Sequence, residues 1–154
     1  ITEQAYGPEH PDVAIRLGNL AGSYRALGRP ADAVPLEQRA LDITERAYGP
    51  DHPDVAILLD NLAASYHALG RPADALPLRQ RALTITEQAY GPEHPDVAIR
   101  LGNLAASYHA LGQMADAVQL CRRAIAVAEK SLPEGHTMAV SLRQFLARLL
   151  DEDR

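Results

Sequence analysis

Cysteine is almost absent from this sequence, since Cys121 is the only one among its 154 residues. A single cysteine excludes an internal disulfide and is typical of proteins that work in a reducing compartment. Lysine is just as scarce: Lys130 is the only lysine among 15 basic residues, and the other 14 are arginine. Together with many alanine, leucine and proline residues, this bias indicates a GC-rich bacterial genome. We therefore expect a bacterial, cytoplasmic protein.

Long apolar runs are missing too. None approaches the roughly 20 residues that a membrane-spanning helix needs, and the first residues lack the pattern of a signal peptide. The net charge of −5 is spread along the chain, and this argues against nucleic acid or an anionic membrane as the main partner. The chain starts at Ile1 and not at methionine, so we expect it to be a fragment of a larger protein.

What the sequence does contain is an internal repeat with a period of 42 residues. Residues 1–42 return as residues 43–84 and as residues 85–126, and a degraded fourth copy begins at Val127. Such a period is typical of solenoid proteins, in which each unit buries its apolar face only by stacking on a neighbour.

Each unit is predicted to form two helices. In the first copy, residues 11–27 carry a core stripe at helical spacing on one face, formed by Val13, Leu17, Leu20, Ala21, Tyr24 and Leu27. Pro11 suits a first helical position, Gly28 suits a left-handed cap after the last turn, and Pro30 suits the start of a second helix over residues 30–48. Strand signals are absent. We therefore predict an all-α α-solenoid of antiparallel helix pairs, with about seven helices including an N-terminal stub.

The repeat pattern divides the chain into five segments. Residues 1–10 are expected to hold the tail of a preceding second helix and a linker. Three repeats follow at residues 11–52, 53–94 and 95–135, and residues 136–154 are expected to form a more polar capping helix.

The repeat resembles the tetratricopeptide repeat. The residues that carry the resemblance in the first copy are Leu17, Leu20, Ala21, Tyr24, Gly28, Ala33 and Ala40. The length of 42 residues and the linker Gly-Pro-Glu-His-Pro look like the extended form found in kinesin light chains and in bacterial signalling proteins. The resemblance implies a right-handed superhelix whose first helices line a concave groove that binds a protein or peptide segment.

The tripeptide His-Pro-Asp at residues 10–12, 52–54 and 94–96 invites a catalytic interpretation. The same letters mark the active loop of J-domain co-chaperones, but here they recur at the repeat period, where helices begin. A metal shared between copies is excluded, because stacked helices lie about 8–10 Å apart and zinc binds nitrogen at about 2.0–2.1 Å. We therefore predict that these histidines are structural.

The sequence gives little support for nucleophilic catalysis. Ser65 and His67 are two residues apart on one helix and point in different directions. Cys121 aligns with Glu37 and Arg79 of the other copies, so we expect a thiol near the surface with no activating group. There is no phosphate-binding glycine loop. We expect no enzymatic activity, no metal and no cofactor.

The resemblance nominates one asparagine per repeat for recognition: Asn19, Asn61 and Asn103. In kinesin light chains and related modules the matching asparagine bonds the backbone of an extended peptide. An amide offers both a donor and an acceptor, so it binds a peptide group whatever the neighbouring side chain. Alternatively, these asparagines bridge neighbouring helices and order the stack.

Further residues are expected to line the groove. Ile15, Ile57 and Ile99 lie off the core stripe and would form an apolar strip.

Asp60 lies among small groove residues, and Arg25, His67 and His109 share one variable position that would select ligand charge, with Arg25 favouring an acidic group. The alternative is that they are ordinary solvated side chains. The leading hypothesis is a non-catalytic scaffold that binds a protein segment, and the alternative is a module that self-assembles through an exposed end of the solenoid.

Overall fold

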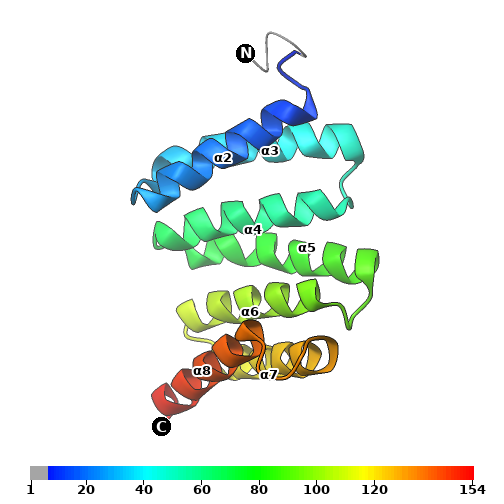
Figure 1. The fold of residues 1–154 in the computed structure, drawn as a ribbon. Coiled ribbons are helices and arrows are strands. Elements are labelled where there is room, and N and C mark those ends of the chain that lie inside the picture. Colours follow the sequence, from blue (N-terminus) through cyan, green and yellow to red (C-terminus); the bar gives the residue numbers. More distant parts are fainter. Residues whose placement is uncertain (1–6) are drawn as a thin grey trace. The chain divides into compact units, whose positions relative to one another are not determined.

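The computed structural model describes residues 7–154 and consists there of helices and turns, with no strand (Figure 1). The seven helices are α2 (Pro11–Ala26), α3 (Pro30–Tyr48), α4 (Pro53–Ala68), α5 (Pro72–Tyr90), α6 (Pro95–Ala110), α7 (Met114–Ser131) and α8 (Thr137–Glu152). The all-α fold is thus confirmed, and residues 7–154 alone contain the seven helices that the prediction reached by counting an N-terminal stub. The predicted N-terminal stub lies in residues 1–6, outside the described residues.

The helices begin as the His-Pro-Asp signal predicts. Nδ1 of His10, His52 and His94 each accepts a hydrogen bond at 3.1 Å from the backbone N–H two residues later, with proline at the first helical position. His136 caps α8 in the same way, by accepting from the N–H of Met138 at 3.1 Å. Each ring satisfies a donor that would otherwise have no partner within the helix. The structural role of the histidines is confirmed.

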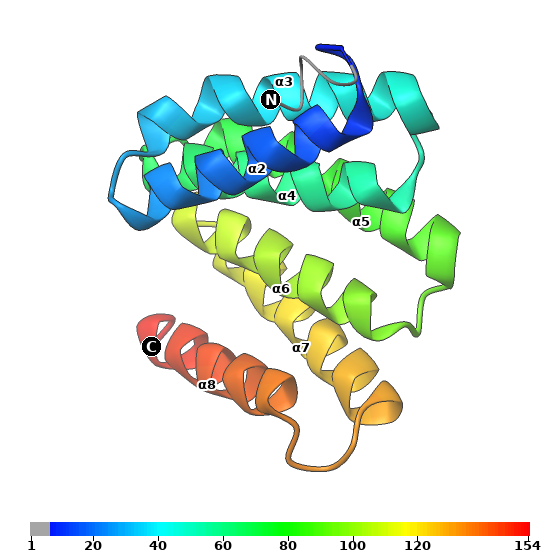
Figure 2. The same ribbon diagram turned by 45° about the horizontal axis from the view of Figure 1, so that its top comes forward.

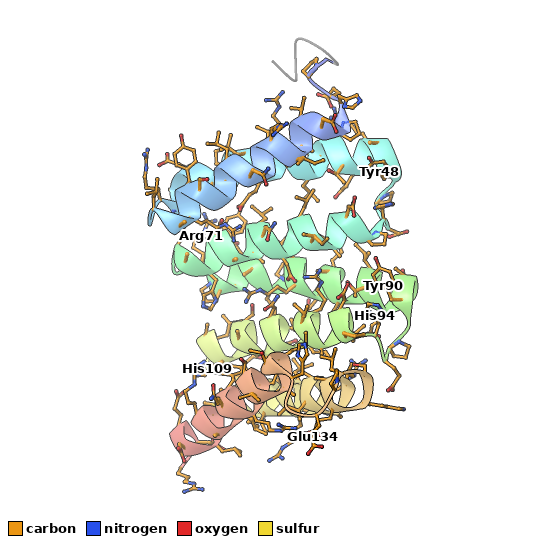
Figure 3. All side chains as sticks on the ribbon, in the orientation of Figure 1. Tyr48, Arg71, Tyr90, His94, His109 and Glu134 are labelled. Carbon is orange, nitrogen blue, oxygen red and sulfur yellow. The ribbon has the colours of Figure 1, made fainter. Side chains whose placement is uncertain are left out.

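Aromatic stacking holds two of these histidine rings in place. The rings of Tyr48 and His52 are 4.8 Å apart, and those of Tyr90 and His94 are 4.5 Å apart at the turn before α6 (Figure 3). Within residues 7–154, no three His, Cys, Asp or Glu side chains are grouped so as to hold a metal ion.

Replacing His52 by alanine should remove the acceptor for the N–H of Asp54 and lower the free energy of unfolding by about 1 kcal/mol. His52→Asn should recover at least half of that loss, because asparagine is among the best N-cap residues. Urea unfolding followed by circular dichroism measures both. An asparagine variant as unstable as the alanine variant would show that the ring acts through something other than the cap.

The first helix of each repeat (α2, α4 and α6) ends in the predicted glycine cap. Gly28 has φ of +73°, the N–H of Gly28 donates to the carbonyl of Arg25 at 3.0 Å, and the N–H of Arg29 donates to the carbonyl of Tyr24 at 2.8 Å. This is the Schellman arrangement, in which a left-handed residue lets the chain close the last turn. Gly70 and Gly112 repeat it after α4 and α6.

The chain forms two compact units, one up to Leu78 and one from Arg79 onward. In the first unit α3 packs against α2 and against α4, and the antiparallel pair α2 and α3 is visible side by side in Figure 2. Part of its core consists of Val13 and Ala14 from α2 together with Ala40 and Ile43 from α3. The small Ala40 is fully buried, and this lets neighbouring helices approach closely.

The second unit contains α6, α7 and α8, and α7 packs against both of the others. Val97, Leu101, Ala124, Val127 and Leu142 belong to one buried cluster of this unit. In each unit, therefore, a second helix lies between two first helices, as the solenoid prediction requires.

Two expected core residues of α2 are not buried. Leu20 and Leu27 were predicted on the core stripe but are 48% and 71% exposed, whereas Leu62 and Leu104, at the position of Leu20 in α4 and α6, are 3% and 4% exposed. In the first unit, α3 packs against α4. The sequence pattern predicts the same burial for Leu20, Leu62 and Leu104, but the burial that each of them attains depends on which helix packs against it.

Candidate functional site

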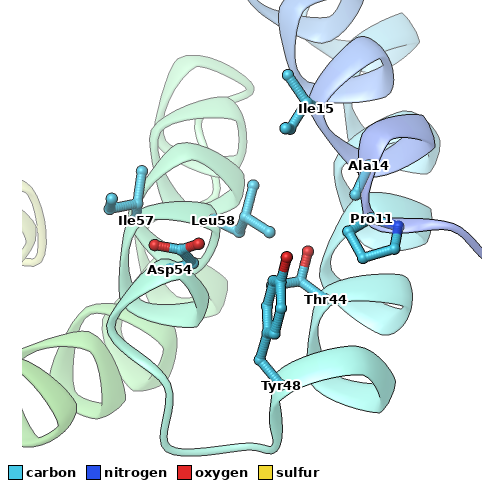
Figure 4. A pocket seen from close by; sticks show the side chains of 8 residues that line it. All are labelled: Pro11, Ala14, Ile15, Thr44, Tyr48, Asp54, Ile57 and Leu58. Carbon is cyan, nitrogen blue, oxygen red and sulfur yellow. The ribbon is translucent and has the colours of Figure 1, made fainter.

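An apolar pocket opens between the first helices of the first unit (Figure 4). It has a volume of about 180 Å³ and is lined by Pro11, Ala14, Ile15, Thr44, Tyr48, Asp54, Ile57 and Leu58. Ile15 comes from α2 and Ile57 from α4, while Thr44 and Tyr48 come from the last turns of α3. The structure thus brings two of the three predicted isoleucines together around one cavity.

These isoleucines are unusually exposed. Ile15 is 59% exposed and Ile57 is 49% exposed, although both lie in the middle of regular helices. Asp54 places the only carboxylate among the pocket-lining residues, so the cavity combines an apolar interior with a negative charge at its edge. Ile99, the third predicted member, is 39% exposed and lies on α6 in the second unit.

The asparagines occupy the same place on each first helix. Asn19 is exposed on α2, and Asn61 is half-buried on α4, both in the first unit; Asn103 is half-buried on α6 in the second. Two of their backbone carbonyls serve the fold: that of Asn19 accepts from the Ser23 hydroxyl at 3.2 Å, and that of Asn103 accepts from Nη1 of Arg79 at 2.9 Å.

Arg25 makes a contact that the sequence did not reveal. Its Nε lies 3.1 Å from Oε1 of Glu37 on α3, a residue that is only 1% exposed. Burial raises the pKa of Glu37, while the neighbouring Ser65 hydroxyl and the charge of Arg25 act in the opposite direction. Arg25 therefore stabilises a buried carboxylate, and its charge is largely compensated within the protein.

The other variable positions differ from one another. His67 is exposed near the end of α4, and Asp60 is buried, with 7% of the residue exposed. His109 on α6 (Figure 3) lies 2.6 Å from Oε2 of Glu152 in the last turn of α8, and its ring contacts that of Phe145 edge to face at 5.9 Å. The last helix thus engages one residue that the sequence assigned to ligand selection.

Cys121 was predicted to lie near the surface, and this was wrong. Its side chain is fully buried, and Sγ donates to the carbonyl of Leu142 in α8 at 3.4 Å. Burial raises the pKa of the thiol, which makes it a poor nucleophile. The prediction took the polar residues at the matching positions as a sign of exposure. It failed because Glu37 and Arg79 are buried as well.

Arg79 is a buried residue that sequence reasoning passed over. Its Nη1 donates to the hydroxyl of Ser107 at 2.8 Å and to the carbonyl of Asn103 at 2.9 Å. The signal was present in the sequence: one position carries glutamate, arginine and cysteine in copies that otherwise differ little. Such variation inside a repeated framework marks a place where each copy meets a different environment.

In each unit the second helix of one repeat packs between the first helices of two repeats, and in the first unit an apolar pocket lies between these first helices. This arrangement defines a helical-repeat scaffold. A tetratricopeptide repeat model matches residues 1–46, 17–87 and 54–130. The chain belongs to the tetratricopeptide repeat family, with repeats of the kinesin light chain type. This family is a class of non-catalytic scaffolds for protein–protein interaction.

Solved structures agree with this assignment. A protein of Podosopora anserina with nearly identical TPR-like repeats of kinesin light chain type is 27% identical, with a TM-score of 0.84 over 94% of this chain and 68% of that chain. BtubC (BKLC) from P. vanneervenii is 23% identical, with a TM-score of 0.83 over 92% of this chain and 57% of that one.

The first TPR of Spaghetti (RPAP3), solved with the HSP90 peptide SRMEEVD, is 17% identical, with a TM-score of 0.67 over 93% of this chain and 94% of that chain. No curated protein matches the sequence. Among residues 7–154, none of the helices has both the length and the apolar character needed to cross a membrane.

Proposed function

We propose that the face formed by the first helices captures an extended segment of a partner protein. The observation that carries the proposal is the pocket between Ile15 and Ile57, two isoleucines that are 59% and 49% exposed around one apolar cavity. Exposed apolar side chains grouped in a cavity are typical of binding sites. The peptide bound by the Spaghetti (RPAP3) repeat supports this use of the fold by analogy alone.

The pocket and the asparagines would divide the work of binding. In the first unit the pocket would receive one apolar side chain of a ligand, while the amide of Asn61 would bond its peptide groups. In the second unit the amide of Asn103 would bond peptide groups in the same way. Because Arg25 is paired with Glu37 and Asp54 lines the pocket, a basic residue beside the apolar anchor fits better than an acidic one. The whole protein would be a larger bacterial signalling or regulatory protein in the cytoplasm.

Peptides selected by this chain from a displayed library should bind less tightly when the pocket or the amides are changed. Ile57→Gln should weaken binding about tenfold, because it removes roughly 1.5 kcal/mol of apolar contact. Asn61→Ala combined with Asn103→Ala should weaken it about 30-fold, since each of the two lost hydrogen bonds contributes about 1 kcal/mol. Fluorescence anisotropy of the selected peptides measures both effects.

Val140→Gln is the matched control, because Val140 is 38% exposed on α8 and lies outside the pocket. It should leave the affinity unchanged, and all variants should keep the helicity of the parent chain. Selected peptides that bind the Ile57 and asparagine variants as tightly as the parent would refute the groove proposal.

Self-assembly is the second candidate function. It is favoured by the exposed side chains of Leu20 and Leu27, which are 48% and 71% exposed at one end of the first unit. In such an assembly another copy of the chain would cover Leu20 and Leu27, and the pocket between Ile15 and Ile57 would bind no ligand. The two functions use different surfaces, so they can be tested separately.

A further inference from the structure

The position of Leu58, which lines the pocket of the first unit, carries different residues in the copies of the repeat. The first and third copies have Arg16 and Arg100 there, and the second and fourth have Leu58 and Leu142. The sequence Asp-Val-Ala-Ile that precedes this position is the same in the first three copies. The change between arginine and leucine therefore alters the chemistry of one place on an otherwise constant helix.

The second unit shows what an arginine does at this position. Nε of Arg100 on α6 donates to the hydroxyl oxygen of Thr86 on α5 at 3.4 Å. Thr86 is buried, and its hydroxyl donates its own proton to the carbonyl of Ala82 at 2.8 Å. The guanidinium thus uses the remaining acceptor capacity of a buried hydroxyl.

The first unit has the same threonine but no arginine that meets it. Thr44 is buried, and its hydroxyl donates to the carbonyl of Ala40 at 2.9 Å. The residue that matches Arg100 is Leu58, whose side chain has no donor. Thr44 and Leu58 both line the pocket of about 180 Å³ (Figure 4). The pocket therefore opens beside the two positions that a guanidinium bridges in the second unit.

The charge at this pocket is negative. Asp54 is the only charged residue that lines it, and its side chain is 58% exposed. The carboxylate lies 3.9 Å from Nδ1 of His52, but this nitrogen already accepts the hydrogen bond from the backbone N–H of Asp54. Among residues 7–154, no arginine or lysine forms an ion pair with Asp54. Its full charge outweighs the roughly half positive charge at the N-terminus of α4, so the pocket favours a cation.

Apolar walls complete the match with an arginine side chain. Ile15 and Ile57 line the cavity from α2 and α4 (Figure 4). The methylene groups of an arginine pack against such walls while its charged head stays at the rim. A guanidinium is weakly hydrated and carries several donors in one plane, so it can bond a carboxylate and a hydroxyl together.

We propose that this pocket binds an arginine side chain of the partner segment. The aliphatic part lies between Ile15 and Ile57, and the guanidinium pairs with Asp54 and donates to Thr44. The ligand thereby supplies to the first unit the group that Arg100 supplies in the second. The inference rests on the proposed function and makes it specific, because the apolar anchor and the basic group become parts of one side chain.

The test titrates n-butylguanidinium and n-butylurea, which share a shape and differ in charge, into the full chain labelled with ¹³C in its isoleucine methyl groups. The methyl signals of Ile15 report binding, because Ile15 lines the pocket. Compounds of this size bind with dissociation constants of about 1 mM. Butylguanidinium should bind about fivefold more tightly than butylurea, which is the effect of a partly exposed ion pair. Equal affinities, or no shift at Ile15 with either compound, would overturn the proposal.

Two variants and a matched control connect this preference to the pocket. Asp54→Asn should abolish the preference, whereas Asp96→Asn, at the same position of α6 and outside the pocket, should keep it. Leu58→Arg gives the pocket the residue of the third copy and should abolish binding of both compounds. A preference that survives Asp54→Asn, or binding of butylguanidinium that survives Leu58→Arg, would contradict the proposal. Circular dichroism checks that the variants fold, and Asp54→Asn decides alone if Leu58→Arg does not.

Peptides selected from the displayed library separate this inference from capture by the groove. Replacing their arginine by citrulline, its neutral isostere, should weaken binding to the parent chain about fivefold and leave binding to Asp54→Asn unchanged. Peptides that need Ile57 but contain no arginine, or bind equally well with citrulline, would overturn the arginine pocket and leave groove capture intact. A chain that prefers butylguanidinium but selects no peptide would support the pocket and refute groove capture.

Discussion

Replacing Leu101 by alanine is expected to lower the free energy of unfolding by about 2–5 kcal/mol, the range for leucine-to-alanine changes in a closed core. Leu101 is fully buried in the cluster that α6, α7 and α8 share. The change removes apolar contacts on both neighbouring helices and leaves a cavity that their regular backbones cannot close. Equilibrium urea unfolding followed by circular dichroism measures the loss.

Leu17→Ala provides the matched control within the same chain. Leu17 has the position of Leu101 in the first copy, with the same sequence around it, but it is only half-buried on α2. Its truncation should therefore cost less than half as much. Equal losses at the two sites would show that local helix propensity, and not burial by neighbouring helices, decides the stability of these repeats.

The limits of the helices were predictable because they depend on local chemistry. His-Pro-Asp supplies a cap and a proline at the first helical position, and a glycine after each first helix allows the left-handed turn. These signals lie within a few residues of the boundary that they set. The predicted second helix over residues 30–48 accordingly has the bounds of α3.

What could not be predicted depends on contacts between helices. Leu20 and Leu62 have the same neighbours in sequence, yet one is half exposed and the other buried. Cys121 aligns with charged residues and was placed near the surface, although its position is buried in all three copies. A repeat reveals which positions are equivalent, and only the stacking shows which of them are covered.

The candidate site also combines features that the sequence predicted with features that only the packing of the helices shows. The exposure of Ile15 and Ile57 followed from their place off the core stripe, but the pocket between them needs side chains of α3 as well. Arg25 was predicted to select the charge of a ligand, and its partner Glu37 becomes evident only when α2 and α3 pack together.

Glu37→Arg is expected to lower the free energy of unfolding by about 3 kcal/mol, because it sets a second guanidinium beside Arg25 in a buried place. The wild-type carboxylate lies 3.1 Å from Nε of Arg25 and is 1% exposed. Adding Arg25→His should recover most of the loss, since the second copy carries His67 and Arg79 at these two positions. A double-mutant cycle of urea midpoints measures the coupling, and independent losses would show that size and not charge is responsible.

Glu37→Gln removes the charge of the carboxylate but keeps its shape, so the contribution of Glu37 to the pH dependence of stability can be measured by difference. Burial raises the pKa of Glu37 above its ordinary value of 4.5, so the folded chain holds this proton more tightly than the unfolded chain does. The contribution of Glu37 to stability is then largest below that ordinary value and falls as the pH rises through the raised pKa. The stability of the parent chain minus that of Glu37→Gln should therefore decrease over this window, because all other titrating groups cancel. A difference that grows with pH would mean that the attraction of Arg25 outweighs the cost of burying the charge.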